Sequence, residues 1–311
     1  MPLKTLIKLW DQFWFSETSP LVVAVFRILI GIILILFILL LTCDLFVWFG
    51  QYGITSNQTA RNFAQFVGLN ILNINRDNDD FLLAFFTLFF LAAVSMTVGY
   101  KTRLSTFIVY LCLTSLYHRN PFLFNSGDTY MRVMSVWLIF SASGQALSLD
   151  NWLKGKESAD LIYKPVSIWP QRLLQLQLNL VYLHTVVAKA WGDSWVDGTA
   201  VYYSTRIEDL VRVKIPYIFD QLWLCQFFSW GTLVIEAALF SLIWIKELRY
   251  YVIVLAVFFH LMIDLHMNIP LFEWIMIFSY VLFIDSEDLR RFLLWGRSKL
   301  LPEKEVVKVQ E

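Results

Sequence analysis

Four polar residues of the segment 172–190 fall on one face of a predicted helix. At about 100° per residue, Gln175, Asn179, Tyr182 and Lys189 lie within a narrow arc. If Lys189 is held in apolar surroundings, desolvation disfavours its ammonium form, and the neutral amine is available as a general base near neutral pH. In the alternative, Lys189 extends toward lipid headgroups while the amides bond a neighbouring helix. Both interpretations remain open at this point.

A second polar group opens the segment 130–147. Asp128 and Arg132 are four residues apart, which makes them neighbours on a helix, and Asn125 precedes them. One interpretation makes Asp128 part of an N-terminal helix cap, with Arg132 as its ion-pair partner. The other gives these residues the task of holding an anionic group.

Two histidines belong to the segment 250–267. His260 lies four residues before Asp264, and His266 and Asn268 follow at the end of the segment. A carboxylate beside an imidazole fixes the tautomer and supports acid–base catalysis, whereas the same pair could simply join two helices. The spacing of the remaining His and Cys residues completes no metal-ligand set, so no metal is expected.

The elements that position these residues are predicted to be membrane-spanning helices. The chain has 311 residues, of which 58% are hydrophobic and only 16% charged, with a mean hydropathy of +0.59. A soluble domain is nearer a quarter charged. Apolar runs in a bilayer must close their backbone hydrogen bonds internally, so we expect helices. The eight predicted spans are 21–48, 80–98, 104–117, 130–147, 172–190, 222–245, 250–267 and 269–285.

The fold class that follows is an all-α polytopic membrane protein, a bundle of about eight transmembrane helices. The third span is short, so seven spans is the alternative. Amphipathic interfacial helices are expected in the two long outer loops, 50–79 and 192–221. We predict one membrane domain over residues 1–290 and a charged cytoplasmic tail over 291–311.

The placement of basic residues predicts the orientation. Sixteen of the 25 Lys and Arg residues fall on the side of the N-terminus, and six fall on the opposite side. This bias puts both termini in the cytoplasm. Five polar residues of three spans then share the outer half of the bundle: Asn125, Asp128, Lys189, His266 and Asn268. With zero net charge and no basic cluster, the chain is not expected to bind nucleic acid.

Residues 177–198, QLNLVYLHTVVAKAWGDSWVDG, contain Lys189 and resemble the most distinctive segment of a known family. This is the vitamin K-dependent γ-carboxylase-like membrane domain, also called the horizontally transferred transmembrane (HTTM) domain. Shorter stretches fit it in order and spacing over about residues 20–290, and the chain resembles the short bacterial members. These stretches are 26–31, 119–128 with 148–150, 266–272 and 278–280.

The resemblance implies a chemistry for Lys189. In the carboxylase, the matching lysine deprotonates a reduced naphthoquinone, and molecular oxygen then generates a base strong enough to remove a proton from a peptide glutamate before carboxylation. The chain departs from the family where Ser126, not histidine, follows Asn125, and no large lumenal domain follows the membrane part. We expect Lys189, His266 and Asp128 to be catalytic. The residues expected to contact substrate or cofactor are Asn125, Arg132, Tyr182, Gln175, Asn179, His260 and Asn268.

Two functions are compatible with these features. The first is a carboxylase-like enzyme or oxygenase that depends on a quinol, of the vitamin K type or a related one, and on O2, with a buried lysine base at the outer face. The alternative is a non-catalytic membrane partner in the maturation or export of a secreted peptide. In both, the partners are the lipid bilayer and a secreted peptide or protein, and the resemblance to bacterial members places the chain in a bacterial cytoplasmic (inner) membrane.

Overall fold

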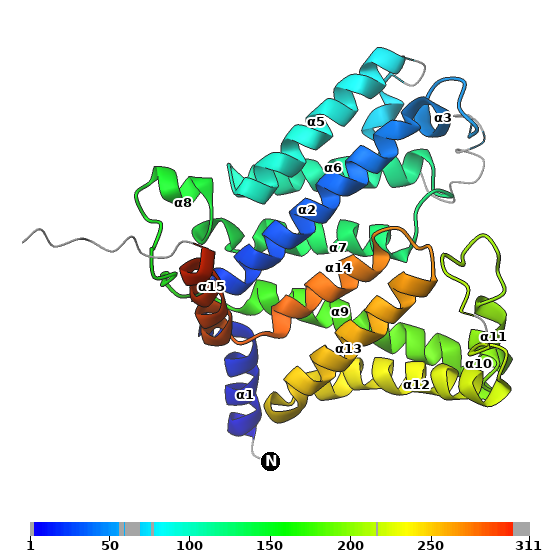
Figure 1. Ribbon diagram of the computed structural model, residues 1–311. Coiled ribbons are helices and arrows are strands. Elements are labelled where there is room, and N and C mark those ends of the chain that lie inside the picture. The colour runs from blue at the N-terminus through cyan, green and yellow to red at the C-terminus, as the bar shows by residue number, and fades with distance from the viewer. Residues whose placement is uncertain (1–2, 56–58, 60–68, 76–77, 216, 301–311) are drawn as a thin grey trace, which may run out of the picture.

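Long helices that lie side by side dominate the computed structural model (Figure 1), which describes residues 3–55, 59, 69–75, 78–215 and 217–300. The long helices are α2 (Leu21–Cys43), α5 (Asp79–Val98), α6 (Thr102–Arg119), α7 (Ser126–Phe140), α9 (Trp169–Ala190), α12 (Leu222–Ser241) and α13 (Lys246–His266). The shorter α14 (Phe272–Ser279) continues into a 3-10 turn, η4 (Tyr280–Phe283).

Short elements gather at the two ends of the bundle. At one end lie α1 (Leu3–Phe15), α8 (Leu149–Leu153) and α15 (Ser286–Leu300), and at the other lie α3 (Leu45–Phe49), α10 (Asp193–Val196) and α11 (Ala200–Ser204) (Figure 1). The remaining 3-10 turns are η1 (Ile71–Asn73), η2 (Ser143–Gln145) and η3 (Leu242–Trp244). Successive long helices alternate in direction between these ends, as the predicted topology requires.

The all-α expectation holds apart from one small strand pair. The two-residue strands β1 (Glu17–Thr18) and β2 (Val166–Ser167) pair antiparallel. They join the link before α2 to the link before α9. The described part of the chain is therefore mostly helical, with a minimal sheet at one end.

Four described helices are long and apolar enough to cross a membrane: α2, α5, α12 with η3, and α13. The other predicted spans correspond to α6, α7, α9 and α14 with η4, which are shorter or more polar. Their crossing of the bilayer, and hence the count of eight, stays a prediction. So do the interfacial helices, because residues 56–58, 60–68 and 76–77 of the first outer loop lie outside the described residues. Of the predicted tail, residues 301–311 lie outside them as well.

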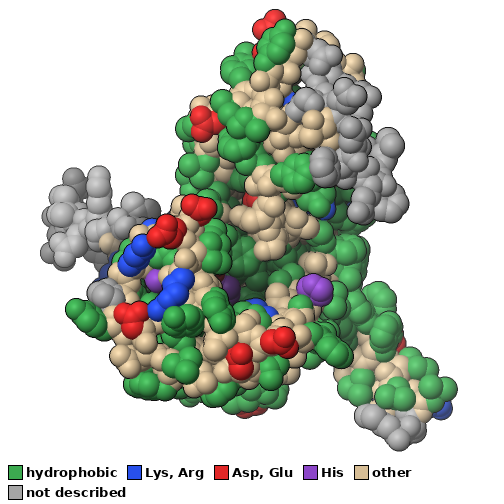
Figure 2. Space-filling view, turned by 90° about the vertical axis from the view of Figure 1, so that its right-hand side faces the viewer, with side chains coloured by type: hydrophobic (Ala, Val, Ile, Leu, Met, Phe, Trp, Pro, Cys, Tyr) green, Lys and Arg blue, Asp and Glu red, His purple; other side chains and the backbone are tan. Residues whose placement is uncertain are grey.

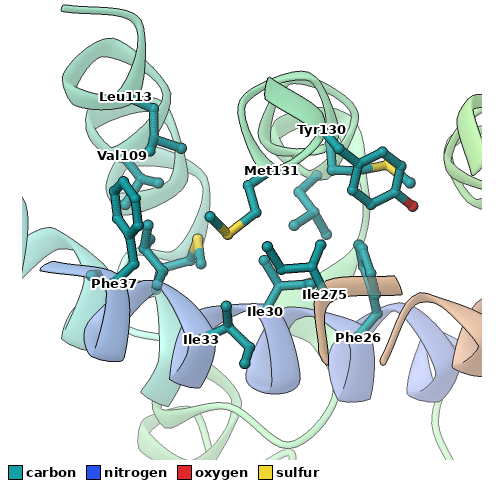
Figure 3. Packing of buried hydrophobic residues seen from close by; sticks show 14 of the residues in the cluster. Phe26, Ile30, Ile33, Phe37, Val109, Leu113, Tyr130, Met131 and Ile275 are labelled. Atoms are coloured by element: carbon teal, nitrogen blue, oxygen red, sulfur yellow. The ribbon is translucent and has the colours of Figure 1, made fainter. Parts of the chain in front are cut away.

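The apolar core centres on α2. Phe26, Ile30, Ile33 and Phe37 recur along one stripe of α2 at helical spacing and are all buried. Figure 3 shows this stripe within one cluster of buried residues, to which α6 contributes Val109 and Leu113, α7 contributes Tyr130 and Met131, and α14 contributes Ile275. The stripe makes α2 the central helix of the part of the bundle that includes α5, α6, α7 and α14.

Close approaches and a buried arginine hold the link between α5 and α6. Gly99 ends α5 with a φ of 76°, a left-handed conformation that glycine adopts without steric cost. A Cβ atom there would lie 2.5 Å from Cβ of Ser148 and 2.7 Å from Nη1 of Arg27. The Arg27 guanidinium donates to the carbonyl oxygens of Ser143 (2.5 Å) and Leu147 (2.6 Å). Arg27 is therefore a buried connector whose described partners are backbone carbonyls.

Candidate functional site

The polar face of α9 points into the bundle, as both interpretations of the sequence require. Gln175, Asn179 and Tyr182 are buried. Nε2 of Gln175 donates to the carbonyl oxygen of Leu282 (2.7 Å), and Nδ2 of Asn179 donates to that of Leu239 (2.7 Å). The amides thus link α9 to η4 and to α12, which is the helix-joining role. Ligand contact by either amide remains a prediction.

Lys189 lies in the last turn of α9, beside a carboxylate on α12. Its Nζ is 2.5 Å from Oε1 of Glu236 and 4.6 Å from the ring centroid of Trp195. The exposed fractions of the two charged side chains are 22% for Lys189 and 8% for Glu236. Of the two interpretations of the sequence, one has a neutral amine in dry, apolar surroundings and the other has a lysine that extends toward headgroups. The structure shows a different arrangement, because an acidic side chain and an aromatic ring hold the amine at the edge of the bundle.

The second carboxylate oxygen of Glu236 also marks this place as a candidate site. Its Oε2 is buried and finds no hydrogen-bond partner among the described residues. A buried polar atom of this kind requires an explanation, because lost hydration is not replaced. Glu236 is not among the site residues predicted from the sequence. Its signal was a lone acidic residue within an apolar span, which is by itself a reason to expect function.

A chain of hydrogen bonds lies in the interior between α9, α13, α14 and η4. Oη of Tyr182 is 2.9 Å from Nε2 of His260 and 2.5 Å from Oη of Tyr280. On its other side, Nδ1 of His260 hydrogen-bonds Oε2 of Glu273. An ionised Glu273 can only accept a hydrogen bond, so it pairs with a protonated Nδ1, and in the neutral imidazole Nε2 then accepts from Tyr182. All four side chains are buried, so the chain forms an ordered polar group in an apolar interior.

The predicted pairing of His260 with Asp264 is wrong. Oδ2 of Asp264 lies 3.5 Å from Nη1 of Arg212, whereas His260 turns inward to Glu273. A separation of four residues places two side chains near one another on a helix, but tertiary neighbours decide which contact forms. Sequence reasoning missed Glu273 and Tyr280, which come from the following helix. A carboxylate in the apolar segment after Pro270 was the signal for Glu273.

The Lys189–Glu236 pair and the buried chain share one helix, because α9 carries both Lys189 and Tyr182. The pair joins α9 to α12, and the chain joins α9 to α13 and η4.

Asp128 and Asn125 form the helix cap that the sequence suggested. Oδ1 of Asn125 accepts from the backbone N–H groups of Gly127 (2.7 Å) and Asp128 (3.2 Å), and Oδ2 of Asp128 accepts from that of Asn125 (2.8 Å). This reciprocal arrangement is a capping box. The predicted ion pair with Arg132 is wrong, because Arg132 covers the ring of Tyr117 at 3.9 Å. The cap turns Asp128 back toward Asn125.

His266 and Asn268 lie at another place, where the loop before α12 packs on the end of α13. The backbone N–H of Asn268 donates to the carbonyl oxygen of Leu210 (2.6 Å). His266 lines a cavity of about 320 Å³. The residues expected to share one outer site thus have different partners: Lys189 has Glu236, Asn125 and Asp128 form a cap, and His266 faces the cavity.

Comparison with known proteins identifies the family of the chain. The profile of the HTTM domain family matches residues 15–287. A curated protein of Bacillus subtilis (strain 168), the uncharacterized protein YitO, is 24% identical over 159 residues. This match covers 47% of the present chain and 50% of that relative, so it spans about half of the relative's length. No solved structure matches significantly.

Proposed function

The chain belongs to the HTTM domain family of carboxylase-related membrane proteins, and on that premise we propose that it is a membrane enzyme that transfers protons at the Lys189–Glu236 pair. The overall reaction proposed is carboxylase-like or oxygenase chemistry that depends on a reduced quinone and O2. One observation carries the proposal. A lysine at the position that matches the family's base is joined to a carboxylate whose second oxygen is buried and has no partner among the described residues.

The residues present suit a quinol. Glu236 offers a hydrogen-bond acceptor at Oε2, Lys189 offers a cation at Nζ, and Trp195 offers an apolar ring 4.6 Å from that cation. These three residues would hold the group. When bound, it would supply an acidic phenolic hydroxyl and two reducing equivalents.

The two charged side chains divide the work. Oε2 of Glu236 accepts a proton while Oε1 stays bonded to Nζ of Lys189. Lys189 keeps its positive charge and stabilises negative charge that develops beside it. Such stabilisation is stronger where water is excluded, because the local dielectric constant is low. In this form of the proposal the base is the carboxylate, and the lysine is its electrostatic partner.

The buried chain supports the pair through α9, which carries both Tyr182 and Lys189. Tyr182 is fixed by hydrogen bonds to His260 and Tyr280, so α9 has a defined position against α13 and η4. An organised interior of this kind keeps α9, α12 and α13 in register, which preserves the short contact between Lys189 and Glu236.

Oxidation of reduced naphthoquinone by the purified full chain in lipid nanodiscs tests the proposal. Absorbance follows quinol oxidation and an electrode follows O2 uptake. Glu236→Gln and Lys189→Met are each expected to lower the rate at least about 100-fold, the usual contribution of a positioned acid–base group. The matched controls are Glu247→Gln and Lys246→Met. These two residues are exposed, lie in the first turn of α13, and should retain the wild-type rate when replaced.

Two outcomes would contradict the proposal. One is wild-type protein that is folded and binds lipid yet oxidises no quinol, which would favour the non-catalytic membrane partner. The other is a Glu236→Gln variant that turns over as fast as its control.

A further inference from the structure

The cavity beside His266 lies where a spanning helix leaves the bilayer. α13 is one of the four helices apolar enough to cross a membrane, and His266 is its last residue. Apolar spans end at the lipid headgroups, so the cavity faces that layer. Figure 2 looks onto this end of the bundle, and acidic and basic side chains lie intermixed on its lower part. The lining residues are Thr205, Arg206, Glu208, Val211, Lys214, Ile215, Phe219, Asp220 and His266.

His266 is buried without a described partner. Its exposed fraction is 7%, and neither ring nitrogen finds a hydrogen-bond partner among the described residues. The surrounding loop fixes its position: the backbone N–H of Arg212 donates to the carbonyl oxygen of His266 (2.8 Å), and the ring of Phe219 lies 4.7 Å from the imidazole. A fixed, buried imidazole that lines a cavity and lacks partners indicates a ligand that supplies them.

The charges around the cavity have both signs. Nη2 of Arg206 is 2.8 Å from Oδ1 of Asp220, and Nζ of Lys214 is 3.8 Å from Oε1 of Glu208. The second pair is long and exposed, so each member is free to take a new partner at little cost. The formal charges cancel, and a ligand with a single sign of charge would meet as much repulsion as attraction.

The remaining wall is apolar. Val211, Ile215 and Phe219 line it. A ligand that uses the whole surface therefore needs a cationic group, an anionic group with hydrogen-bond acceptors, and an apolar part.

We propose that this cavity binds a zwitterionic phosphate ester, namely the phosphoethanolamine group of a phospholipid. The phosphate oxygens accept hydrogen bonds from His266, Arg206 and Lys214, because phosphate is well matched to guanidinium and ammonium donors. The ammonium group donates to Glu208 and Asp220. The glycerol and acyl portions lie toward Val211, Ile215 and the bilayer. This site involves neither Lys189 nor Glu236 and stands apart from the proposed enzyme activity.

Native mass spectrometry of the detergent-solubilised full chain tests the site. The protein is titrated with phosphatidylethanolamine and, separately, with phosphatidylglycerol, which lacks the ammonium group. Wild-type protein should retain phosphatidylethanolamine preferentially. His266→Ala should weaken that retention about tenfold, the effect of losing one charge-assisted hydrogen bond. The matched control is His184→Ala, an exposed histidine on α9, which should bind as wild type does.

A second variant changes an exposed residue, so its effect on binding is separate from any effect on folding. Glu208 is 86% exposed, so Glu208→Gln leaves the fold intact while removing an acceptor for the ammonium group. It should lower the preference for phosphatidylethanolamine over phosphatidylglycerol. Thermal unfolding in the same detergent checks that each variant is folded.

Soluble phosphoethanolamine distinguishes a lipid from a free ester as the source of the group. At millimolar concentration it should leave the lipid bound, because it lacks the glycerol and acyl portions, and displacement at that concentration would overturn the assignment to a lipid. Equal retention of both lipids in wild type and in both variants would overturn the proposal. Binding of a zwitterionic peptide at this cavity, with no retention of phosphatidylethanolamine, would overturn it as well.

Discussion

The helices α2 and α13 have similar lengths, and both are apolar enough to cross a membrane, yet the protein uses them differently. Of the most apolar 18-residue window, 67% is buried inside the protein in α2 and 22% in α13. The charged residue in the interior of α2, Arg27, bonds backbone carbonyls. α13 instead carries His260, Asp264 and His266, which contact side chains of other elements or face a cavity. The half around α2 behaves as a scaffold, and the proposed chemistry lies in the half around α12 and α13, where less protein covers the helices.

This difference has a physical cause. A helix that faces lipid gains little from apolar contact with its neighbours, because lipid tails are as apolar as leucine. Polar contacts must therefore hold α12 and α13 to α9. They include Asn179 with the carbonyl of Leu239, Lys189 with Glu236, and Tyr182 with His260. The bonds that assemble this half also bring together the groups proposed to transfer protons.

Replacement of Arg27 should have the largest effect on stability. Arg27→Met leaves the carbonyls of Ser143 and Leu147 buried without their donor, and we expect a loss of about 2–4 kcal/mol. Arg132→Met is the matched control, because it removes a cation that covers a ring and should cost about 1 kcal/mol or less. Unfolding in detergent, followed by tryptophan fluorescence, measures both. Equal losses of unfolding free energy in the two variants would show that Arg27 is no more important to stability than a cation that covers a ring.

Replacement of Tyr182 should have an intermediate effect in the other half. Tyr182→Phe keeps the ring but leaves Nε2 of His260 and Oη of Tyr280 without a shared partner, at a cost of about 1–3 kcal/mol. Tyr117→Phe is the control, since it keeps the ring that Arg132 covers. If the two variants unfold at the same temperature, the buried chain does not hold α9 to α13.

Asp150 supplies a smaller, pH-dependent effect at the end of the half around α2. Partial desolvation opposes ionisation, but hydrogen bonds from Thr102 and the backbone N–H of Lys101 outweigh it and lower the pKa of this carboxyl. A lowered pKa in the folded state stabilises the protein above the unfolded pKa, and this contribution is lost as the pH falls through the folded value.

The measurement compares wild type with Asp150→Asn over a range of pH. The difference in melting temperature should be largest near pH 6 and should shrink as the pH falls below the unfolded value of about 3.9 and the wild-type carboxyl gains its proton. A difference that is constant over this range would show that the charge of Asp150 is not what stabilises the link between α5 and α6.

Local patterns predicted the parts of the fold that depend on neighbouring residues. Helical spacing identified the buried face of α9, and the order Asn125 to Asp128 identified the helix cap. The HTTM resemblance, which rested chiefly on the segment around Lys189, is confirmed by the family match. Each of these depends on residues that lie close together in the sequence.

Partners from separate helices were beyond local patterns. Glu236 and Glu273 meet Lys189 and His260 only after the helices pack, so the residues near Lys189 in the sequence do not indicate Glu236 as its partner. The pairs His260–Asp264 and Asp128–Arg132 failed for the converse reason, since spacing permits a contact that other neighbours prevent. The count of eight spans stays a prediction because polar residues and breaks lower the hydropathy or length of α6, α7 and α9.

Infrared difference spectroscopy of the Glu236 carboxyl tests proton transfer at the Lys189–Glu236 pair most directly. Reduced naphthoquinone is added to the full chain in nanodiscs without O2, and the spectrum before addition is subtracted. We predict a new C=O band of a protonated carboxyl that shifts in D2O and is missing in Glu236→Gln. No such band in wild type, or the same band in Glu236→Gln, would contradict the assignment of Glu236 as the proton acceptor.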